Sequence, residues 1–227
     1  MKKALALILV LFSIATLCAC SKKGDDNNTG DTGSISTKDT DNTPSEKSFQ
    51  RGTVENNTYT STFIGLKLKL DDSWTFSSDK EMLEMMDLGS ELLSDQQKLA
   101  AEISKQQTVY DAMAQQASGS NVIIMFENMS LTDDGNSYDE TRYAEVLKQQ
   151  LDLSDLTYSY DDLKTIKIAD ENYLLLSTKT EYNSVQIEQS FLIRKIDSYM
   201  AVICITSFPD VDTTISVQDI IAHFEKA

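Results

Sequence analysis

The sequence predicts an α+β layer fold over an antiparallel sheet, and three observations carry this prediction. Four apolar stretches in the second half are joined by only two or three polar residues. Joints this short force antiparallel neighbours, because parallel pairing needs a crossover of a dozen residues or more. Stretches of helical period are gathered in blocks between the strands. Blocks of helices between runs of strands are typical of the α+β class.

The folded part begins with short strands. Thr53 to Ser61 predicts two extended pieces around the turn signal Asn56-Asn57. Leu66 to Leu70 alternates leucine with lysine, which is the period of a strand with one solvent-exposed face. A turn at Asp71-Asp72-Ser73 then leads into a further extended piece, Trp74 to Phe76.

A helical block follows these strands. Ser78 and Glu81 have the spacing of a capping box, which predicts a helix start. Ser94 and Gln97 predict a second start after the break at Gly89-Ser90. The apolar side of this block contains Met82, Met85, Met86, Leu92, Leu93, Leu99 and Ile103.

The remaining elements alternate between strands and single helices. Tyr110 to Ala114 and Val122 to Glu127 predict a hairpin around Ser118-Gly119-Ser120. Ser137 with Glu140 predicts the cap of a helix. One face of that helix contains Tyr143, Val146, Leu147 and Leu151.

Four strands and a final helix complete the predicted domain. The strands are Thr165 to Ile168, Tyr173 to Thr180, Val185 to Ile196 and Tyr199 to Ser207. Ser216 is expected to cap the last helix. Its inward-facing residues are expected to be Val217, Ile220, Ile221 and Phe224.

The N-terminus resembles the export signal of bacterial lipoproteins. A basic start, Met1-Lys2-Lys3, precedes an apolar run, Ala4 to Leu17, that is shorter than the roughly 20 residues of a spanning helix. Leu17-Cys18-Ala19-Cys20 has the form of a lipobox with Cys20 as the acceptor, because Cys18 follows the bulky Leu17. The resemblance implies a diacylglyceryl thioether on Cys20, and two acyl chains anchor a protein firmly. A plain secretory signal is the alternative.

These features divide the chain into three parts. Residues 1–19 are expected to be the lipoprotein signal peptide and residues 20–51 the lipidated cysteine with a disordered linker, since that segment has few apolar residues. Residues 52–227 form the expected domain. Counted from Arg51 to the C-terminus, the formal net charge is −16, because the residues before Arg51 contain equal numbers of acidic and basic side chains. Such a surface excludes nucleic acid as a partner.

Several residues near the start of the domain resemble a known family. Gly52, Val54, Asn57, Tyr59, Phe63, Gly65, Trp74 and Phe76 look like the opening of small Gram-positive lipoproteins with a PsbP-like domain. The resemblance implies an α-β-α sandwich with a central antiparallel sheet. For function it implies a non-catalytic accessory or binding role. Members usually have a proline shortly before the tryptophan, whereas Asp71-Asp72-Ser73 stands there in this chain.

The residues that catalysis would need are sparse. His223 is the only histidine, and no Gly-x-Ser-x-Gly elbow exists to pair with it. Cys204 lies in an apolar run, where a lone cysteine behaves as a small buried hydrophobic residue. One histidine and no free cysteine pair also argue against zinc. We therefore expect no enzyme, no cofactor and no metal.

An acidic turn gives one alternative. Asp133-Asp134-Gly135-Asn136 resembles part of a calcium loop, but the EF-hand ligand positions are not filled. A looser oxygen cage that includes Asp139 or Glu140 stays open, as does the simpler reading of a solvated turn before a capped helix.

The methionines give the candidate partner surface. Met82, Met85 and Met86 at helical spacing are usually core residues, but a methionine face can also adapt to varied partners. We expect the helical region Ser78 to Gln107 to frame the binding surface.

The sequence therefore predicts a lipoprotein at the extracytoplasmic face of the cell membrane. It is expected to act as a non-catalytic binding or accessory module for a protein or cell-wall partner. A wall-facing hydrolase that uses carboxylates, or a calcium-dependent binding protein, is the alternative.

Overall fold

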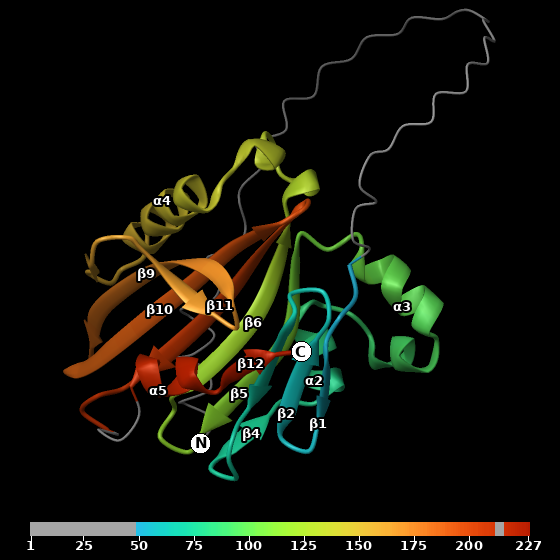
Figure 1. The fold of residues 1–227 in the computed structure, drawn as a ribbon, viewed down its shortest axis with the longest axis horizontal. Helices are drawn as coiled ribbons and strands as arrows, with labels where there is room; N and C mark the ends of the chain where they lie inside the picture. Colours follow the sequence, from blue (N-terminus) through green and yellow to red (C-terminus); the bar gives the residue numbers. More distant parts are fainter. Residues whose placement is uncertain (1–48, 212–215) are drawn as a thin grey trace, which may run out of the picture.

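The computed structural model describes residues 49–211 and 216–227 (Figure 1). The predicted signal peptide, the lipobox Leu17-Cys18-Ala19-Cys20 and most of the predicted linker lie outside the described residues. Within the described ranges, no helix is long and apolar enough to cross a membrane.

A large antiparallel sheet forms the centre of the domain. Its order is β4-β5-β6-β11-β10-β9-β7, and β8 also pairs with β9. The strands are β4 (Trp74–Phe76), β5 (Thr108–Gln116), β6 (Asn121–Asn128), β7 (Ser159–Tyr160), β8 (Lys164–Ile168), β9 (Glu171–Tyr182), β10 (Val185–Ile196) and β11 (Tyr199–Ser207). Every pairing is antiparallel, as the short joints predict. The predicted hairpin is the pair β5 and β6.

A second, four-stranded antiparallel sheet contains both ends of the domain. Its order is β1 (Thr53–Glu55), β2 (Thr58–Ser61), β3 (Leu66–Lys69) and β12 (Phe224–Lys226). The expected last helix, α5 (Val217–Ala222), is shorter than predicted: His223 is its C-cap, and Phe224 begins β12 opposite Leu68. Phe224 is buried as expected, but it belongs to a strand.

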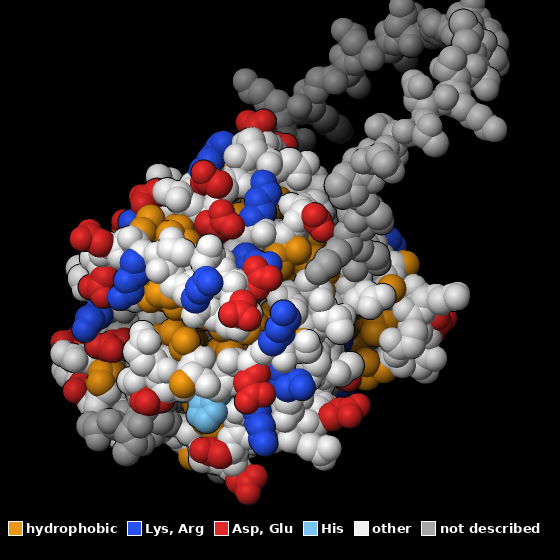
Figure 2. All heavy atoms as spheres, viewed as in Figure 1, with side chains coloured by type: hydrophobic (Ala, Val, Ile, Leu, Met, Phe, Trp, Pro, Cys, Tyr) orange, Lys and Arg blue, Asp and Glu red, His pale blue; other side chains and the backbone are white. Residues whose placement is uncertain are grey.

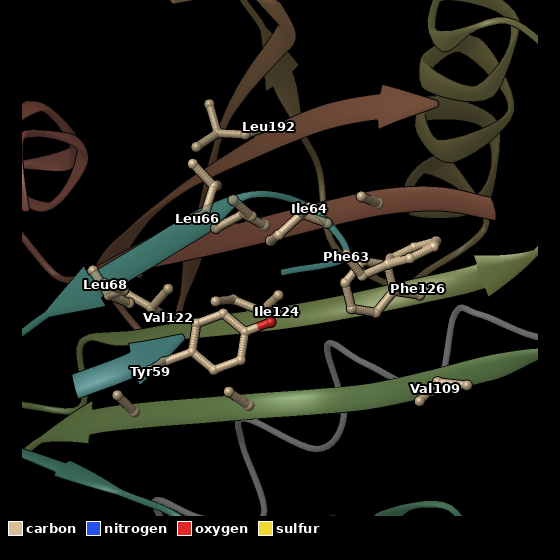
Figure 3. Close-up of a cluster of buried hydrophobic side chains, with 14 of the residues drawn as sticks. Tyr59, Phe63, Ile64, Leu66, Leu68, Val109, Val122, Ile124, Phe126 and Leu192 are labelled. Atoms are coloured by element: carbon tan, nitrogen blue, oxygen red, sulfur yellow. The ribbon is translucent and has the colours of Figure 1, made fainter. Parts of the chain in front are cut away.

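The two sheets enclose the larger core. Figure 3 shows Tyr59 and Leu68 of the second sheet beside Val122 and Ile124 of β6, and Leu66 beside Leu192 of β10. Together with α5, the second sheet thus covers one face of the large sheet. The other face packs against α4 (Glu140–Asp152). The α+β class and the antiparallel sheets are confirmed, but one outer layer of the expected α-β-α sandwich is mainly a sheet.

The remaining helices have caps that partly differ from the prediction. They are α2 (Asp79–Met85), η1 (Ser90–Ser94), α3 (Gln96–Ile103), η2 (Met129–Leu131) and η3 (Gly135–Ser137). The capping boxes of α2 and α5 are confirmed at Ser78 and Ser216. The N-cap of α3 is Asp95 and that of α4 is Asp139, because a carboxylate one or two residues further on accepts the free backbone N–H instead.

Candidate functional site

A cleft of about 680 Å³ lies where the chain enters the domain. Its walls come from the first described residues, from α2 and α3, and from β11. The lining residues are Phe49, Gln50, Arg51, Gly52, Thr53, Asp79, Leu93, Gln96, Leu99, Ala100, Ile103, Ser104 and Tyr199. More than half of them belong to the region Ser78 to Gln107, which was expected to frame the binding surface.

Phe49 fixes one wall of the cleft. Its ring stacks on Tyr199, with centroids 4.8 Å apart, and meets Phe63 and Phe126 edge to face at 5.1 Å. Offset stacked and edge-to-face pairs are the favoured geometries of aromatic rings. Phe49, which precedes the predicted domain start at residue 52, therefore packs against aromatic residues of the domain.

A β-bulge in β5 directs an aspartate toward the entering chain. Tyr110 pairs with Met125 and Ala112 with Ile124, so Asp111 is the extra residue of β5. A bulge re-aims a side chain that regular alternation would direct elsewhere. Asp111 consequently points to the side of the sheet that carries the second sheet.

Asp111 is a buried carboxylate with several donors. The Tyr59 hydroxyl donates to it at 2.6 Å, and the backbone N–H of Gly52 at 2.9 Å. The Nε of Arg51 lies 3.3 Å from its Oδ1. Burial raises the pKa of Asp111, while these donors work in the opposite direction. Burial, together with the neighbouring carboxylate, also raises the pKa of Tyr59.

Arg51 and Gly52 are fixed by this carboxylate. Arg51 also reaches Asp79 on α2 at 3.4 Å, so it joins the entering chain to a cleft wall. A Cβ on Gly52 would collide with the ring of Tyr59, which leaves room only for glycine. The arrangement therefore joins the entering chain to β5 through Asp111 and to α2 through Asp79.

The sequence prediction did not identify Arg51, Tyr59 and Asp111 as a group. One signal was present: an aspartate stands within the apolar run of the predicted hairpin strand. A charged residue inside such a run is seldom buried without partners. Its partners come from residues more than fifty positions earlier, and local patterns do not show this.

The methionines lie mainly in the core. Met82 and Met86 are buried at 2% and 6% exposure, and Met85 is half-buried. Met82 packs against Met113 and Ile123 of the large sheet. None of the three methionines lines the cleft. Their burial favours the core interpretation over the partner surface.

Asp139 and Glu140, which follow the acidic turn, form hydrogen bonds with backbone N–H groups. Asp139 caps α4, and Glu140 accepts a 2.9 Å hydrogen bond from the backbone N–H of Lys195. Within the described ranges, no group of three or more His, Cys, Asp or Glu side chains could hold a metal ion. The two carboxylates considered for a looser calcium cage thus have other partners.

His223 is exposed, whereas Cys204 is buried. His223 is exposed at the end of α5, where it interacts electrostatically with Asp71 and Asp219. Cys204 is fully buried in β11, and burial raises the pKa of its thiol to about 12. A protonated, inaccessible thiol is a poor nucleophile.

A second buried carboxylate lies below α4. Glu127 of β6 is 4% exposed and interacts with the hydroxyl of Tyr143. Burial raises the pKa of Glu127 to about 7, and the hydrogen bond opposes this only in part. Burial raises the pKa of Tyr110, and the charge of Glu127 raises it further. Glu127 does not line the cleft.

On the face shown in Figure 2, acidic and basic side chains are interspersed. They form no extended basic patch there, in keeping with the net charge of −16. Recognition of a phosphate backbone depends on such a patch.

Comparisons with protein-family models and with curated proteins find no match. Among the similar solved structures is the solution structure of cyanobacterial PsbP (CyanoP) from Synechocystis sp. PCC 6803, at a TM-score of 0.45 and 12% identity. The match covers 75% of this chain and 91% of that chain. A likeness at this level carries no argument about function, so the cleft is interpreted from its own residues.

Proposed function

We propose that this chain is a lipid-anchored, extracytoplasmic binding or accessory module without catalytic activity. The anchoring rests on Leu17-Cys18-Ala19-Cys20 at the end of a short apolar run. Acylation of Cys20 would attach the mature protein without a membrane-spanning helix. The resemblance to Gram-positive lipoproteins with a PsbP-like domain supports the same location.

The observation that carries the binding role is the cleft beside Phe49 and Arg51. Aliphatic and aromatic side chains line it together with polar and charged ones, among them Arg51, Asp79 and Gln96, and its volume of about 680 Å³ is in the usual range of binding sites. The ion pair between Arg51 and Asp111 makes one wall rigid. Rigid, preformed walls lower the entropic cost of binding.

The anchor is tested by mass spectrometry of the N-terminus from membrane fractions. The native chain should begin at Cys20 with two acyl chains attached. Cys20→Ala should abolish acylation and release the protein, whereas Cys18→Ala should leave both unchanged. An unmodified N-terminus, or native protein found free in the medium, would contradict the anchoring.

The cleft is tested by cross-linking on intact cells. A photoreactive residue at Gln96, inside the cleft, should capture a defined partner, whereas one at the exposed Gln149 of α4 should not. Ala100→Trp fills the cleft and should abolish capture. Equal capture from both positions, or capture that survives Ala100→Trp, would place the partner elsewhere.

Calorimetry with calcium and with soluble wall fragments separates the proposal from its alternatives. Binding without turnover supports a non-catalytic module. Turnover of a wall fragment would favour the carboxylate-dependent hydrolase. Binding that requires calcium would favour the calcium-dependent protein.

A further inference from the structure

The cleft has two long walls that run side by side. One wall is the entering segment, residues 49–53, and the other is α3 (Figure 1). The α3 wall consists of Gln96, Leu99, Ala100, Ile103 and the C-cap Ser104. Their spacing of three and four residues places them on one face of the helix. The cleft is therefore an elongated groove that follows the whole of α3.

The length of this groove sets the size of its ligand. At about 1.5 Å per residue, the 8 residues of α3 span about 12 Å. An extended peptide advances about 3.3 Å per residue. The groove therefore accommodates about four residues of an extended peptide.

The groove has an apolar floor. Leu99, Ile103 and Tyr199 line it and are each at most 9% exposed. The half-buried Phe49 and Leu93 extend this apolar surface. A ligand that fills the groove therefore needs large apolar side chains directed toward the floor.

The rim of the groove is polar. It consists of the exposed lining residues Gln50, Thr53, Asp79, Gln96 and Ser104. Successive side chains of an extended peptide point to opposite sides, so every second side chain faces the floor and the others face the rim. The ligand should therefore alternate between apolar and polar residues.

The charge at the rim selects a cation. Arg51 reaches Asp79 at 3.4 Å, but the same guanidinium lies 3.3 Å from Oδ1 of Asp111 and donates to the carbonyl of Asp111 at 3.1 Å. Among the described residues, no other cation lies within ion-pair distance of Asp79, and its side chain is 68% exposed. Asp79 can thus pair with a ligand cation. The net charge of −16 also attracts cations to the surface.

The rim amides favour a peptide over a cationic lipid. Gln96 donates from Nε2 to the carbonyl of Leu93 at 3.3 Å, so its Oε1 stays available as an acceptor. Gln50 supplies a second exposed amide from the other wall. A side-chain amide has both donors and an acceptor. A peptide backbone pairs with both kinds of group, whereas an alkyl chain pairs with neither.

We infer that the groove binds an extended segment of a partner protein, about four residues long, in which apolar residues alternate with lysine or arginine. The apolar side chains pack on Leu99, Ile103 and Tyr199, and a basic side chain pairs with Asp79. This inference rests on the proposed binding role of the cleft and adds the chemistry of the partner.

The test is calorimetric titration of the full chain, in a neutral detergent at low ionic strength, with three acetylated tetrapeptide amides. Leu-Lys-Leu-Lys should bind with a Kd of about 1 mM or tighter. Leu-Glu-Leu-Glu should bind at least roughly tenfold more weakly, because it brings like charges to Asp79. Ser-Lys-Ser-Lys should also bind at least roughly tenfold more weakly, because it buries no large apolar side chain on the floor.

Two charge-removing variants locate the cation. Asp79→Asn should weaken the binding of Leu-Lys-Leu-Lys roughly three- to fivefold, as expected for a partly exposed ion pair. Asp87→Asn is the matched control, because it removes the same charge just after α2 and outside the cleft. Asparagine tolerates the positive φ of 55° at this position. Asp87→Asn should leave the affinity unchanged.

Ala100→Trp fills the groove and should abolish peptide binding. Equal binding of the lysine and glutamate peptides would overturn the inference, as would equal effects of Asp79→Asn and Asp87→Asn, or binding that survives Ala100→Trp. Absence of binding by all three peptides would overturn it too. If a cross-linker at Gln96 still captured a partner in that case, the cleft would bind another class of ligand and the proposed function would stand. Loss of capture as well would contradict both.

Discussion

The Nε of Arg51 lies 3.3 Å from Oδ1 of Asp111, although sixty residues separate the two in the sequence. The carboxylate is buried in a bulge of β5, and the arginine belongs to the segment that enters the domain. This pair therefore joins the entering chain to the core. In a protein anchored at Cys20, it would be the point where the tether meets the folded domain.

Asp111→Asn should destabilise the domain by about 3 kcal/mol, because it leaves the largely buried charge of Arg51 without its closest partner. Chemical denaturation gives the free energy of unfolding. Asp79→Asn removes the exposed partner of the same arginine and should cost less than about 1 kcal/mol. Equal effects would show that the buried pair has no special role.

Glu127 should make stability depend on pH. Its pKa rises from 4.5 to about 7 on folding, so the folded state favours the protonated form. The contribution of Glu127 to the free energy of unfolding is fully present below pH 4.5 and is lost as the pH rises to about 7. This is a change of about 3 kcal/mol.

Glu127→Gln keeps a neutral side chain at every pH and should flatten this part of the stability profile. Denaturation midpoints measured across this pH range check the prediction. If stability depends on pH equally steeply in the variant and in the parent, groups other than Glu127 cause this dependence.

Met86→Lys should destabilise the domain by about 3 kcal/mol or more, because it buries an ammonium group at a position only 6% exposed. Met85→Lys should cost less than about 1 kcal/mol, since its half-buried position lets the lysine reach solvent. Thermal unfolding of both variants gives the comparison. If the Met86→Lys protein were folded and stable but no longer captured the partner, the hypothesis that the methionines form a partner surface would be supported instead.

Cys204 should not react with iodoacetamide in the native protein at mildly alkaline pH, because its thiol is buried and its pKa is about 12. After denaturation, a single thiol per chain should react if Cys18 is removed with the signal and Cys20 is acylated. Mass spectrometry counts the modified residues. Additional reactive thiols in the denatured chain would show that Cys20 is free.

Local patterns predicted most of the elements. The short polar joints after β9 and β10 predicted antiparallel neighbours, and the capping boxes of α2 and α5 predicted two helix starts. The predicted caps of α3 and α4 were displaced, because several adjacent residues can accept the same backbone N–H groups. Phe224 was correctly expected to be buried, but its strand pairing depends on β3, which is distant in the sequence.

The sequence by itself determined the class of fold and the acidic character, because periodicity and composition are local properties, and a short motif predicts the anchor at Cys20. Only the tertiary structure decided which residues meet. It brought Arg51 and Tyr59 to Asp111 through a bulge, and it placed one face of α3 beside the entering chain. The physical reason is that register and bulges depend on pairing between distant strands, and a single residue of displacement changes the face on which a side chain lies.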